Sequence, residues 1–242
     1  MNPASTIARS ELILGGQKSG KSRRAELLAR QWLAQSPTHR ALLLATGQAW
    51  DVEMQERIAR HQRERAERVP GLLTLEEPRD LAGVLARVSS PQALVVVDCL
   101  TLWLTNWLMP ASSVSGAGDR AGPHPHPLPE GEGVNPTARG AQCLATAPGR
   151  GEGLGAPDKE QKTPITQDWS AQSALFFEAL QHASGPVVLV GNEIGLGVIP
   201  LGREVRAFVD ALGRLNQDMA AACARVTLMC AGLPLTLKDE SA

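Results

Sequence analysis

The stretch GGQKSGKS at residues 15–22 follows directly on the apolar run Leu12–Leu14. It matches G-x-x-x-x-G-K-S, the phosphate-binding loop that joins a buried strand to a helix. The glycines of such a loop let the backbone curl, so that successive N–H groups face a polyphosphate. The helix expected over residues 21–35 adds its unpaired N-terminal donors and the positive end of its dipole. A chance glycine turn is the alternative, and the order strand, loop, helix disfavours it.

We therefore expect this loop to bind nucleotide phosphates, with Lys21 reaching the terminal phosphates as a catalytic group and the Ser22 hydroxyl ligating Mg²⁺. The run ALVVVD at residues 93–98 ends in a carboxylate at the carboxyl edge of a predicted strand. An acidic residue at that place holds Mg²⁺ in phosphate-loop proteins, so Asp98 is the second predicted metal-binding residue, although a helix-capping aspartate is the alternative. The predicted phosphate-binding residues are Gly15, Gly16, Gln17, Lys18, Ser19, Gly20, Lys21 and Ser22.

Short β-rich runs alternate with helical patterns along the chain. Strands separated by helices imply right-handed crossovers, so we predict a P-loop (RecA-like) three-layer α/β sandwich with a mostly parallel sheet. Several of the strands are continuous Val/Leu runs, which are typical of strands buried on both faces. Strands are expected at 11–14, 41–45, 72–75, 93–98, 186–191, 226–230 and 235–238. Helices are expected at 21–35, 51–69, 79–88, 168–183 and 203–224.

One stretch, from about residue 111 to 167, is crowded with Gly and Pro and has few large apolar residues. It cannot bury enough surface to offset the entropy of ordering, so we expect a flexible insertion in a surface loop. The prediction is one nucleotide-binding domain over 8–242 that this insertion interrupts. His124 and His126 lie inside it; a metal contact is conceivable for an H-P-H pair, and a solvated loop is the favoured interpretation.

Composition argues against several classes of protein. The 24 basic and 25 acidic residues nearly cancel, so no bulk field draws the chain to nucleic acid or to an anionic membrane. No apolar run approaches the ~20 residues that a membrane span needs, and the N-terminal residues lack the apolar core of a secretory signal. The four cysteines show no metal-binding spacing. We expect a cytoplasmic protein without a membrane span and without a nucleic-acid partner.

The segment DVEMQERIARHQRER at residues 51–65 is predicted to form a charged helix on which Arg57, His61 and Arg65 share a face. Neighbouring cations favour the neutral imidazole, whose free ring nitrogen can act as a nucleophile. The arginines would stabilise charge on transferring phosphoryl oxygens. A solvated surface helix is the alternative, and the residues by themselves leave both interpretations open.

Three further segments carry weaker signals. TLEE at 74–77 places carboxylates at a strand end, where they could bind a ribose or base edge or cap a helix. VGNEIGLGVIP at 190–200 is a Gly-rich turn after a buried strand, the usual lining of a ligand crevice in a parallel sheet. A long amphipathic helix follows, with polar residues that are either core caps or contacts between subunits: Arg206, Asp210, Asn216 and Gln217.

Taken together, these segments resemble the bifunctional adenosylcobinamide kinase/adenosylcobinamide-phosphate guanylyltransferases of cobalamin biosynthesis. The resemblance covers nearly everything except the first few residues and the insertion. Only the phosphate loop is a strong motif by itself, whereas the order and combination of all the segments are highly specific. Besides that loop they are ATG at 45–47, the helix at 51–65, TLEEP at 74–78, VVVDCLTLWLTN at 95–106, VGNEIGLGVIP at 190–200, REVRAFVDALGRLNQDMA at 203–220 and AGLPLTLK at 231–238.

The resemblance implies two reactions on one fold. ATP or GTP phosphorylates the aminopropanol hydroxyl of adenosylcobinamide, and GMP is then moved from GTP onto adenosylcobinamide phosphate through a histidine–GMP intermediate, giving adenosyl-GDP-cobinamide and pyrophosphate. The R-I-x-x-H pattern of the family places the nucleophile at His61. A covalent intermediate on this imidazole divides the transfer of GMP into two displacements. A homotrimer with sites near subunit boundaries is also implied. The implied nucleotide contacts beyond the loop are Thr46, Gly47, Gln62, Arg65, Glu76 and Asp98.

Two positions depart from the family pattern. Leu72 stands where members often carry an aromatic residue, and FVD at 208–210 stands where they commonly read F-R-D, so a phosphate contact would have to come from elsewhere, such as Arg206. The rival interpretations are a phosphate-loop kinase without nucleotidyl transfer, a GTP switch, which would need the N-K-x-D segment that is missing here, and a RecA-like motor. The sequence does not decide between ATP and GTP, nor does it identify the residues that bind corrinoid.

Overall fold

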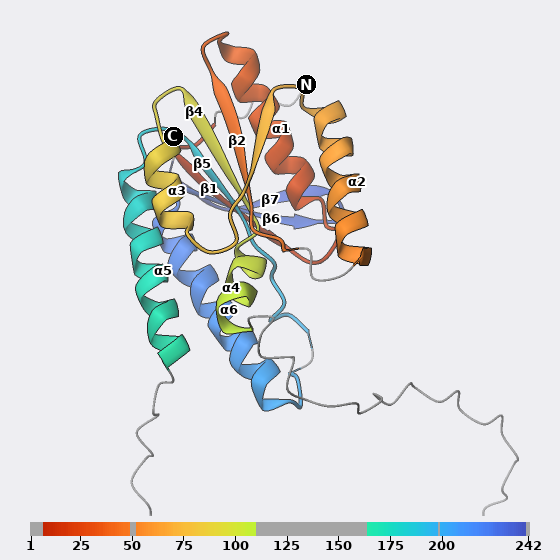
Figure 1. Ribbon diagram of the computed structural model, residues 1–242, viewed down its shortest axis with the longest axis vertical. Helices are drawn as coiled ribbons and strands as arrows, with labels where there is room; N and C mark the ends of the chain where they lie inside the picture. The colour runs from red at the N-terminus through yellow and green to blue at the C-terminus, as the bar shows by residue number, and fades with distance from the viewer. Residues whose placement is uncertain (1–6, 49–51, 110–163, 198, 241–242) are drawn as a thin grey trace, which may run out of the picture. The chain divides into compact units, whose positions relative to one another are not determined.

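The structure is a computed structural model and describes residues 7–48, 52–109, 164–197 and 199–240 (Figure 1). The described chain alternates strands and helices, as the sequence predicts. The strands are β1 Ser10–Gly15, β2 Arg40–Ala45, β3 Leu72–Glu76, β4 Ala93–Asp98, β5 Val187–Val190, β6 Arg225–Cys230 and β7 Leu233–Asp239. The helices are α1 Lys21–Gln35, α2 Val52–Arg68, α3 Leu81–Val88, α4 Leu100–Leu108, α5 Pro164–His182 and α6 Arg203–Ala222.

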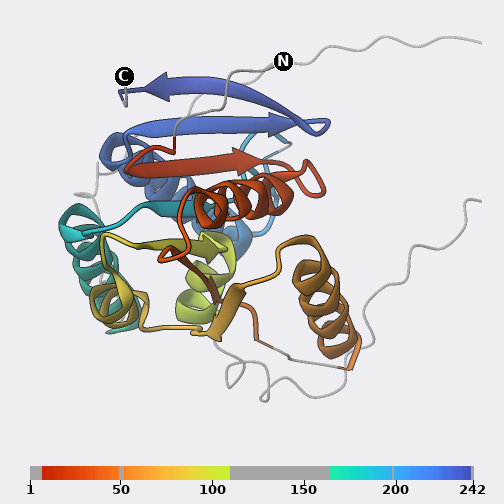
Figure 2. The ribbon, with the colours of Figure 1, turned by 90° about the horizontal axis from the view of Figure 1, so that it is seen from above.

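The strands form one seven-stranded sheet in the order β3-β2-β4-β5-β1-β6-β7. All neighbours pair in parallel except β6 and β7, which form an antiparallel hairpin. Helices cover both faces of the sheet (Figure 2). The predicted P-loop (RecA-like) three-layer α/β sandwich with its mostly parallel sheet is therefore confirmed. Strand β5 lies between β1, which leads into the phosphate loop, and β4, which ends in Asp98.

Alternate residues of the central strands pack into two separate hydrophobic cores, one on each face of the sheet. In β4, Val95 and Val97 pack with apolar side chains of α3, α4, α5 and α6, whereas Leu94 and Val96 pack with those of α1. This alternation follows from the period of two in a β-strand, and it needs apolar residues at every position because both faces are covered. The Val/Leu runs in the sequence are explained by this double burial.

Two elements differ from the sequence prediction. Helix α4 was not predicted; its side chain Trp103 is fully buried and packs edge-on against Phe176 with ring centroids 5.0 Å apart. Helix α5 begins at Pro164, so the last four residues of the predicted insertion are helical. Residues 110–163, with His124 and His126, lie outside the described residues, and the flexible insertion stays a prediction. None of the described helices is long and apolar enough to cross a membrane.

The register of the sheet brings predicted site residues to one edge. Ala45 at the end of β2 pairs with Glu76 of β3 on one side and with Asp98 of β4 on the other. Asp98 in turn pairs with Val190 of β5. Because parallel strands all end at the same edge, the segments that follow them meet there with the phosphate loop that follows β1.

Candidate active site

The phosphate loop runs from Gly15, the last residue of β1, to Ser22 in the first turn of α1. The backbone turns at Lys18 and Gly20, whose φ angles are 56° and 101°. Gly15 has a φ of 152°, and a Cβ atom there would lie 2.5 Å from the carbonyl oxygen of Met229. Only glycine fits that close approach of two backbones.

The backbone amides of the loop are left for a ligand. Within the described chain, the N–H of Ser19 is the one amide among residues 16–22 that donates to a backbone carbonyl, that of Gly16. The turn between β6 and β7 supports the loop from behind, because Gly232 donates its N–H to the Ser19 carbonyl over 3.0 Å. A supported curl of unpaired N–H groups at a helix N-terminus is a phosphate-binding arrangement.

Lys21 is drawn into the loop rather than extended into water. It is 8% exposed, and its Nζ donates to the Gly16 carbonyl over 2.6 Å. Burial lowers the pKa of Lys21, and the nearby Cys99 and Asp98 partly offset that effect. A buried ammonium with few anionic partners gains most from a phosphate that arrives beside it.

Asp98 at the end of β4 and Ser22 in the first turn of α1 are in contact, although β5 lies between β4 and β1 in the sheet. The Ser22 hydroxyl hydrogen-bonds to the Asp98 carboxyl group. Burial raises the pKa of Asp98, and the Ser22 hydrogen bond and the charges of Arg65 and Lys21 act in the opposite direction. The structure thus brings together the two residues predicted to hold Mg²⁺. Their hydroxyl and carboxylate oxygens are the hard donors that this ion prefers, and no cluster of three or more acidic, His or Cys ligands occurs in the described chain.

Thr46 occupies a supporting position rather than an open one. It is fully buried; its hydroxyl donates to the Cys99 carbonyl over 2.7 Å and accepts from the Cys99 amide over 2.8 Å. Its N–H donates to the Asp98 carbonyl, and its own carbonyl accepts from Asn106 Nδ2 over 2.8 Å. These bonds hold the segment that carries Asp98. Gly47, the next residue, is half-buried beside Leu102.

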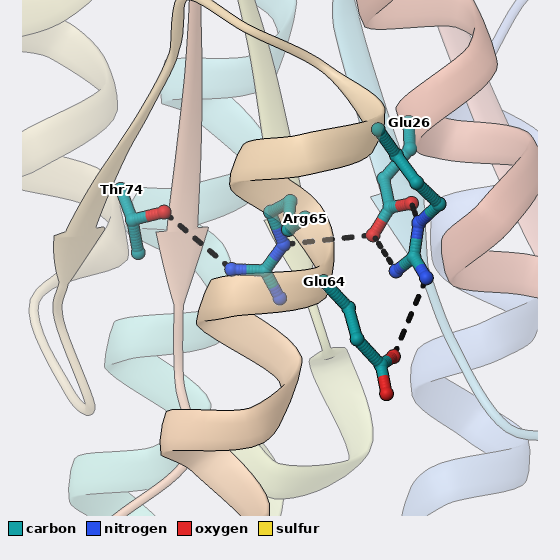
Figure 3. A network of polar contacts seen from close by, with 5 residues as sticks. Glu26, Glu64, Arg65 and Thr74 are labelled. Carbon is teal, nitrogen blue, oxygen red and sulfur yellow. Dashed lines mark hydrogen bonds and ion pairs between the residues drawn. The ribbon is translucent and has the colours of Figure 1, made fainter.

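A polar network attaches α2 to α1 and β3 (Figure 3). Arg65 lies between Glu26 and Thr74, with Nε 3.6 Å from Glu26 Oε1 and NH1 3.4 Å from Thr74 Oγ1. Arg68 makes two hydrogen bonds to the same Glu26 carboxylate, at 2.8 and 3.1 Å, and one to Glu64. Glu26 is 4% exposed, so this carboxylate is the buried centre of the attachment. Glu26 was not among the residues predicted for the site.

His61 lies on α2 one helical turn before Arg65, and its side chain is exposed. Ser22 likewise lies one turn before Glu26 on α1. Both helices run away from the carboxyl edge of the sheet, and the Arg65–Glu26 contact holds the last third of α2 against the first two turns of α1. His61 is thus one turn of α2 before this contact. The side chain of Arg57 lies outside the described residues.

The other predicted contacts are divided between two places. Gln62 Nε2 donates to Glu76 Oε1 over 3.1 Å, so these two residues join α2 to the end of β3 on the exposed surface. Arg206 belongs to the other side of the sheet, where its guanidinium donates to the carbonyls of Pro200 and Leu201 just before α6. In this structure Arg206 therefore caps a turn.

Comparison with known proteins identifies the family of this chain. The profile of the family described as cobinamide kinase / cobinamide phosphate guanyltransferase matches residues 11–237. The bifunctional adenosylcobalamin biosynthesis protein CobP of Pseudomonas aeruginosa is 37% identical over 231 residues, which are 95% of this chain and 98% of that protein. The CobU proteins of the same description from Escherichia coli and Salmonella typhimurium are 29% and 27% identical over 94% of this chain and 98% of theirs. The chain belongs to the cobinamide kinase/cobinamide phosphate guanyltransferase family.

Proposed function

We propose that the protein phosphorylates adenosylcobinamide with ATP or GTP and then transfers GMP from GTP to adenosylcobinamide phosphate through a covalent intermediate on His61. The products of the second reaction are adenosyl-GDP-cobinamide and pyrophosphate. The observation that supports the proposal is the contact between Arg65 and Glu26, because it holds the part of α2 that carries the exposed His61 against the first turns of α1. Family membership supports both activities, and the phosphate loop supports a triphosphate as donor.

The phosphate loop would hold the β- and γ-phosphates with its free amides, while Lys21 leaves the Gly16 carbonyl to meet them. Ser22 and Asp98 would hold Mg²⁺ together with phosphate oxygens, and the ion would neutralise charge on the transferring group. Thr46 would keep the Asp98 segment in position through its bonds to Cys99. Ser22, Asp98 and Thr46 need little rearrangement, because hydrogen bonds already hold them, whereas Lys21 exchanges the Gly16 carbonyl for phosphate.

In the second reaction a ring nitrogen of His61 attacks the α-phosphorus of GTP. The P–N bond forms as the α–β bridging P–O bond breaks, and the electron pair leaves with pyrophosphate. A phosphate oxygen of adenosylcobinamide phosphate then displaces the imidazole. Arg65 would position helix α2, which carries His61, through its ion pair with Glu26. Gln62 and Glu76, which join α2 to the end of β3, would contact the guanosine.

We further propose a homotrimer as the working form. The resemblance to trimeric relatives suggests it, and the surface of β7 supports association because Leu233, Leu235 and Leu237 are 71%, 56% and 57% exposed. A row of large apolar side chains on an edge strand commonly marks an interface. Light scattering at micromolar concentration would show three times the chain mass, and a monomeric mass would refute the trimer.

The test of the transfer chemistry uses GTP labelled at the α-phosphorus, with no corrinoid present. The proposal expects an acid-labile, base-stable labelled protein that loses its label when adenosylcobinamide phosphate is added. A kinase without nucleotidyl transfer would give no labelled protein. A label that remains on the protein after the acceptor is added would also contradict the proposal.

A further inference from the structure

A hollow of about 890 Å³ lies between the loop that follows β5, the exposed side of α6 and residues Val226, Leu237 and Lys238 of β6 and β7. Leu237 thus borders both the hollow and the apolar surface of β7. Its volume is within the range of small-molecule sites, roughly 300–1,000 Å³. Apolar side chains on the loop, of which Leu196 and Ile199 are 82% and 77% exposed, face charged and amide groups on α6. The polar groups of its lining include Arg206, Asp210, Arg214, Asn216 and Gln217.

One end of this hollow adjoins the phosphate loop. Leu14, which lines the hollow, directly precedes Gly15, and the N–H of Glu193 donates to the Gly15 carbonyl over 3.1 Å. On the other side, the N–H of Asn192 donates to the Thr101 hydroxyl at the start of α4 over 3.0 Å. The turn after β5 is thus fixed between the triphosphate cradle and the segment that carries Asp98. Glu193 lies where the cradle and the hollow meet.

The carboxylate of Glu193 is held in one orientation. Its Oε1 accepts from the Gly195 N–H over 3.1 Å, and its Oε2 accepts from Asn216 Nδ2 over 3.3 Å. Asn216 is only 4% exposed and also donates to the Asn192 carbonyl over 3.0 Å. A carboxylate has about four acceptor positions, so two bonds fix this one and leave capacity for a ligand hydroxyl.

We propose that the hollow binds the corrinoid acceptor and that Glu193 is the catalytic carboxylate of the kinase step. This inference rests on the function proposed above. A corrinoid is a broad apolar macrocycle rimmed with amide side chains, which matches a lining of exposed aliphatic residues beside guanidinium, carboxylate and amide groups. A pendant hydroxyl at the end of the hollow nearest Gly15 would meet Glu193 and the γ-phosphate together.

In this step the acceptor oxygen forms a bond to the γ-phosphorus while the bridging bond between the γ-phosphorus and the β-phosphate oxygen breaks. The electron pair of that bond leaves with the nucleoside diphosphate. The hydroxyl proton passes to the Glu193 carboxylate and from there to water. Kinases commonly use a carboxylate in this way to orient the attacking hydroxyl and accept its proton. Asn216 is then a positioning residue that acts through Glu193.

The first test is Glu193→Gln, which keeps the shape of the side chain and removes its basic oxygen. The expected result is a fall in kcat of the kinase step of about 10²- to 10⁴-fold. Nucleotide affinity and the formation of labelled protein from GTP should change by no more than about twofold, because neither needs the acceptor hydroxyl. Glu204→Gln is the matched control, since this exposed carboxylate on α6 does not line the hollow. A wild-type kcat in Glu193→Gln would overturn the role of Glu193.

The second test fills the hollow. Gly213 lines it, and a Cβ atom there would have no heavy atom within 4 Å, so a side chain can begin at this position and extend toward the hollow. Gly213→Leu should raise the KM for adenosylcobinamide more than about tenfold, and Gly213→Ala should raise it less. An unchanged KM overturns the corrinoid site, and an unchanged KM with an altered oligomeric mass shows that a second copy covers the hollow instead. Wild-type protein without kinase activity and without the GMP adduct would refute the proposed function itself, whereas active wild type with unaffected variants refutes only this inference.

Discussion

The phosphate loop and helix α2 both face the carboxyl edge of the sheet, but they are built in opposite ways. In the loop, Lys21 is buried against a backbone carbonyl, and Ser22 is already bonded to Asp98. On α2, His61 is exposed, and the helix is held one and two turns further on by the ion pairs of Arg65 and Arg68 with one buried carboxylate. In the first region the proposed metal-binding residues are already in contact, whereas the second presents the proposed nucleophile on a helix that is held from one side.

This difference indicates how the two activities can be separated. A preassembled cradle serves any reaction that uses a triphosphate, so damage to it should affect every step that binds phosphates there. An exposed nucleophile serves only the step in which it forms a bond, so its loss should be confined to that step. Mutations in the two regions should therefore give different patterns of loss.

The largest effect is expected for His61→Ala. Loss of the proposed nucleophile should reduce guanylyl transfer by about 10⁴-fold or more, while kinase turnover stays within about threefold of wild type. Parallel assays of guanylyl transfer and of kinase turnover measure this. His182→Ala is the matched control, because it removes another exposed helical histidine far along the chain. Equal loss of both activities in His61→Ala would contradict the separation.

Lys21→Ala should have the next largest effect, because it changes the phosphate loop and leaves helix α2 untouched. Loss of this ammonium removes a charge-assisted contact to the transferring phosphoryl group, which is worth about 10²- to 10³-fold in kcat of the kinase step. Arg30→Ala, an exposed cation on the same helix, should leave kcat unchanged. Kinase turnover near the wild-type value in Lys21→Ala would mean that the triphosphate binds elsewhere.

Asp98→Asn should trade activity for stability. Loss of a metal-holding carboxylate should reduce kinase activity by about 100-fold. Burial raises the pKa of Asp98 above its ordinary value of 3.8, so the stability that it contributes is present when it is protonated and is lost as the pH rises through the raised pKa. The neutral amide should therefore increase the melting temperature at pH 7. The difference in melting temperature between Asp98→Asn and wild type should shrink as the pH falls toward 3.8. Melting curves between pH 7 and that value measure it, and a constant difference would contradict the prediction.

Glu26→Gln should loosen α2 without touching the cradle. The change leaves Arg65, whose side chain is 12% exposed, without its charged partner and should lower the free energy of unfolding by about 2 kcal/mol, less than for a fully buried pair because Arg68 is half-exposed. Urea unfolding measures this loss. Guanylyl transfer should fall more than kinase turnover, and a uniform fall in both would show that the network supports the whole fold equally.

The smallest effect is expected for Glu64→Gln. Its ion pair with Arg68 joins side chains that are 45% and 42% exposed, and such pairs contribute at most about 0.5 kcal/mol. Urea unfolding of this variant beside Glu26→Gln compares the outer and inner contacts of one arginine. A loss of unfolding free energy as large as that of Glu26→Gln would mean that Glu26 is not the main attachment point of α2.

The layered fold and the phosphate loop could be predicted because their signals are local. An apolar run, a Gly-rich turn and a following helix are contiguous in the sequence, and Asp98 ends a strand that reads as buried. Helix α4 escaped prediction because six of its nine residues are Leu or Trp and its N-cap, Cys99, makes no capping side-chain bond. Periodicity alone does not separate such a short apolar helix from a strand.

The supports of the site could not be predicted, because they depend on contacts between distant residues. Glu26 meets Arg68 across 42 positions, and Asn106 reaches the Thr46 carbonyl across 60. Glu193 was noticed only as part of a Gly-rich turn, since its place beside Gly15 follows from the insertion of β5 between β1 and β4. Sequence patterns indicate the chemistry of a side chain but not its neighbour in the folded sheet.

The central claim is that His61 carries GMP between the two substrates. Peptide mass spectrometry of the full-length protein after incubation with GTP, under mildly basic conditions, tests it most directly. We expect a mass increase of one guanylyl group on the peptide that contains His61, with fragment ions that locate it on that imidazole. The increase should disappear in His61→Ala. A guanylyl group located on any other residue, or none at all in a protein that still makes adenosyl-GDP-cobinamide, would contradict it.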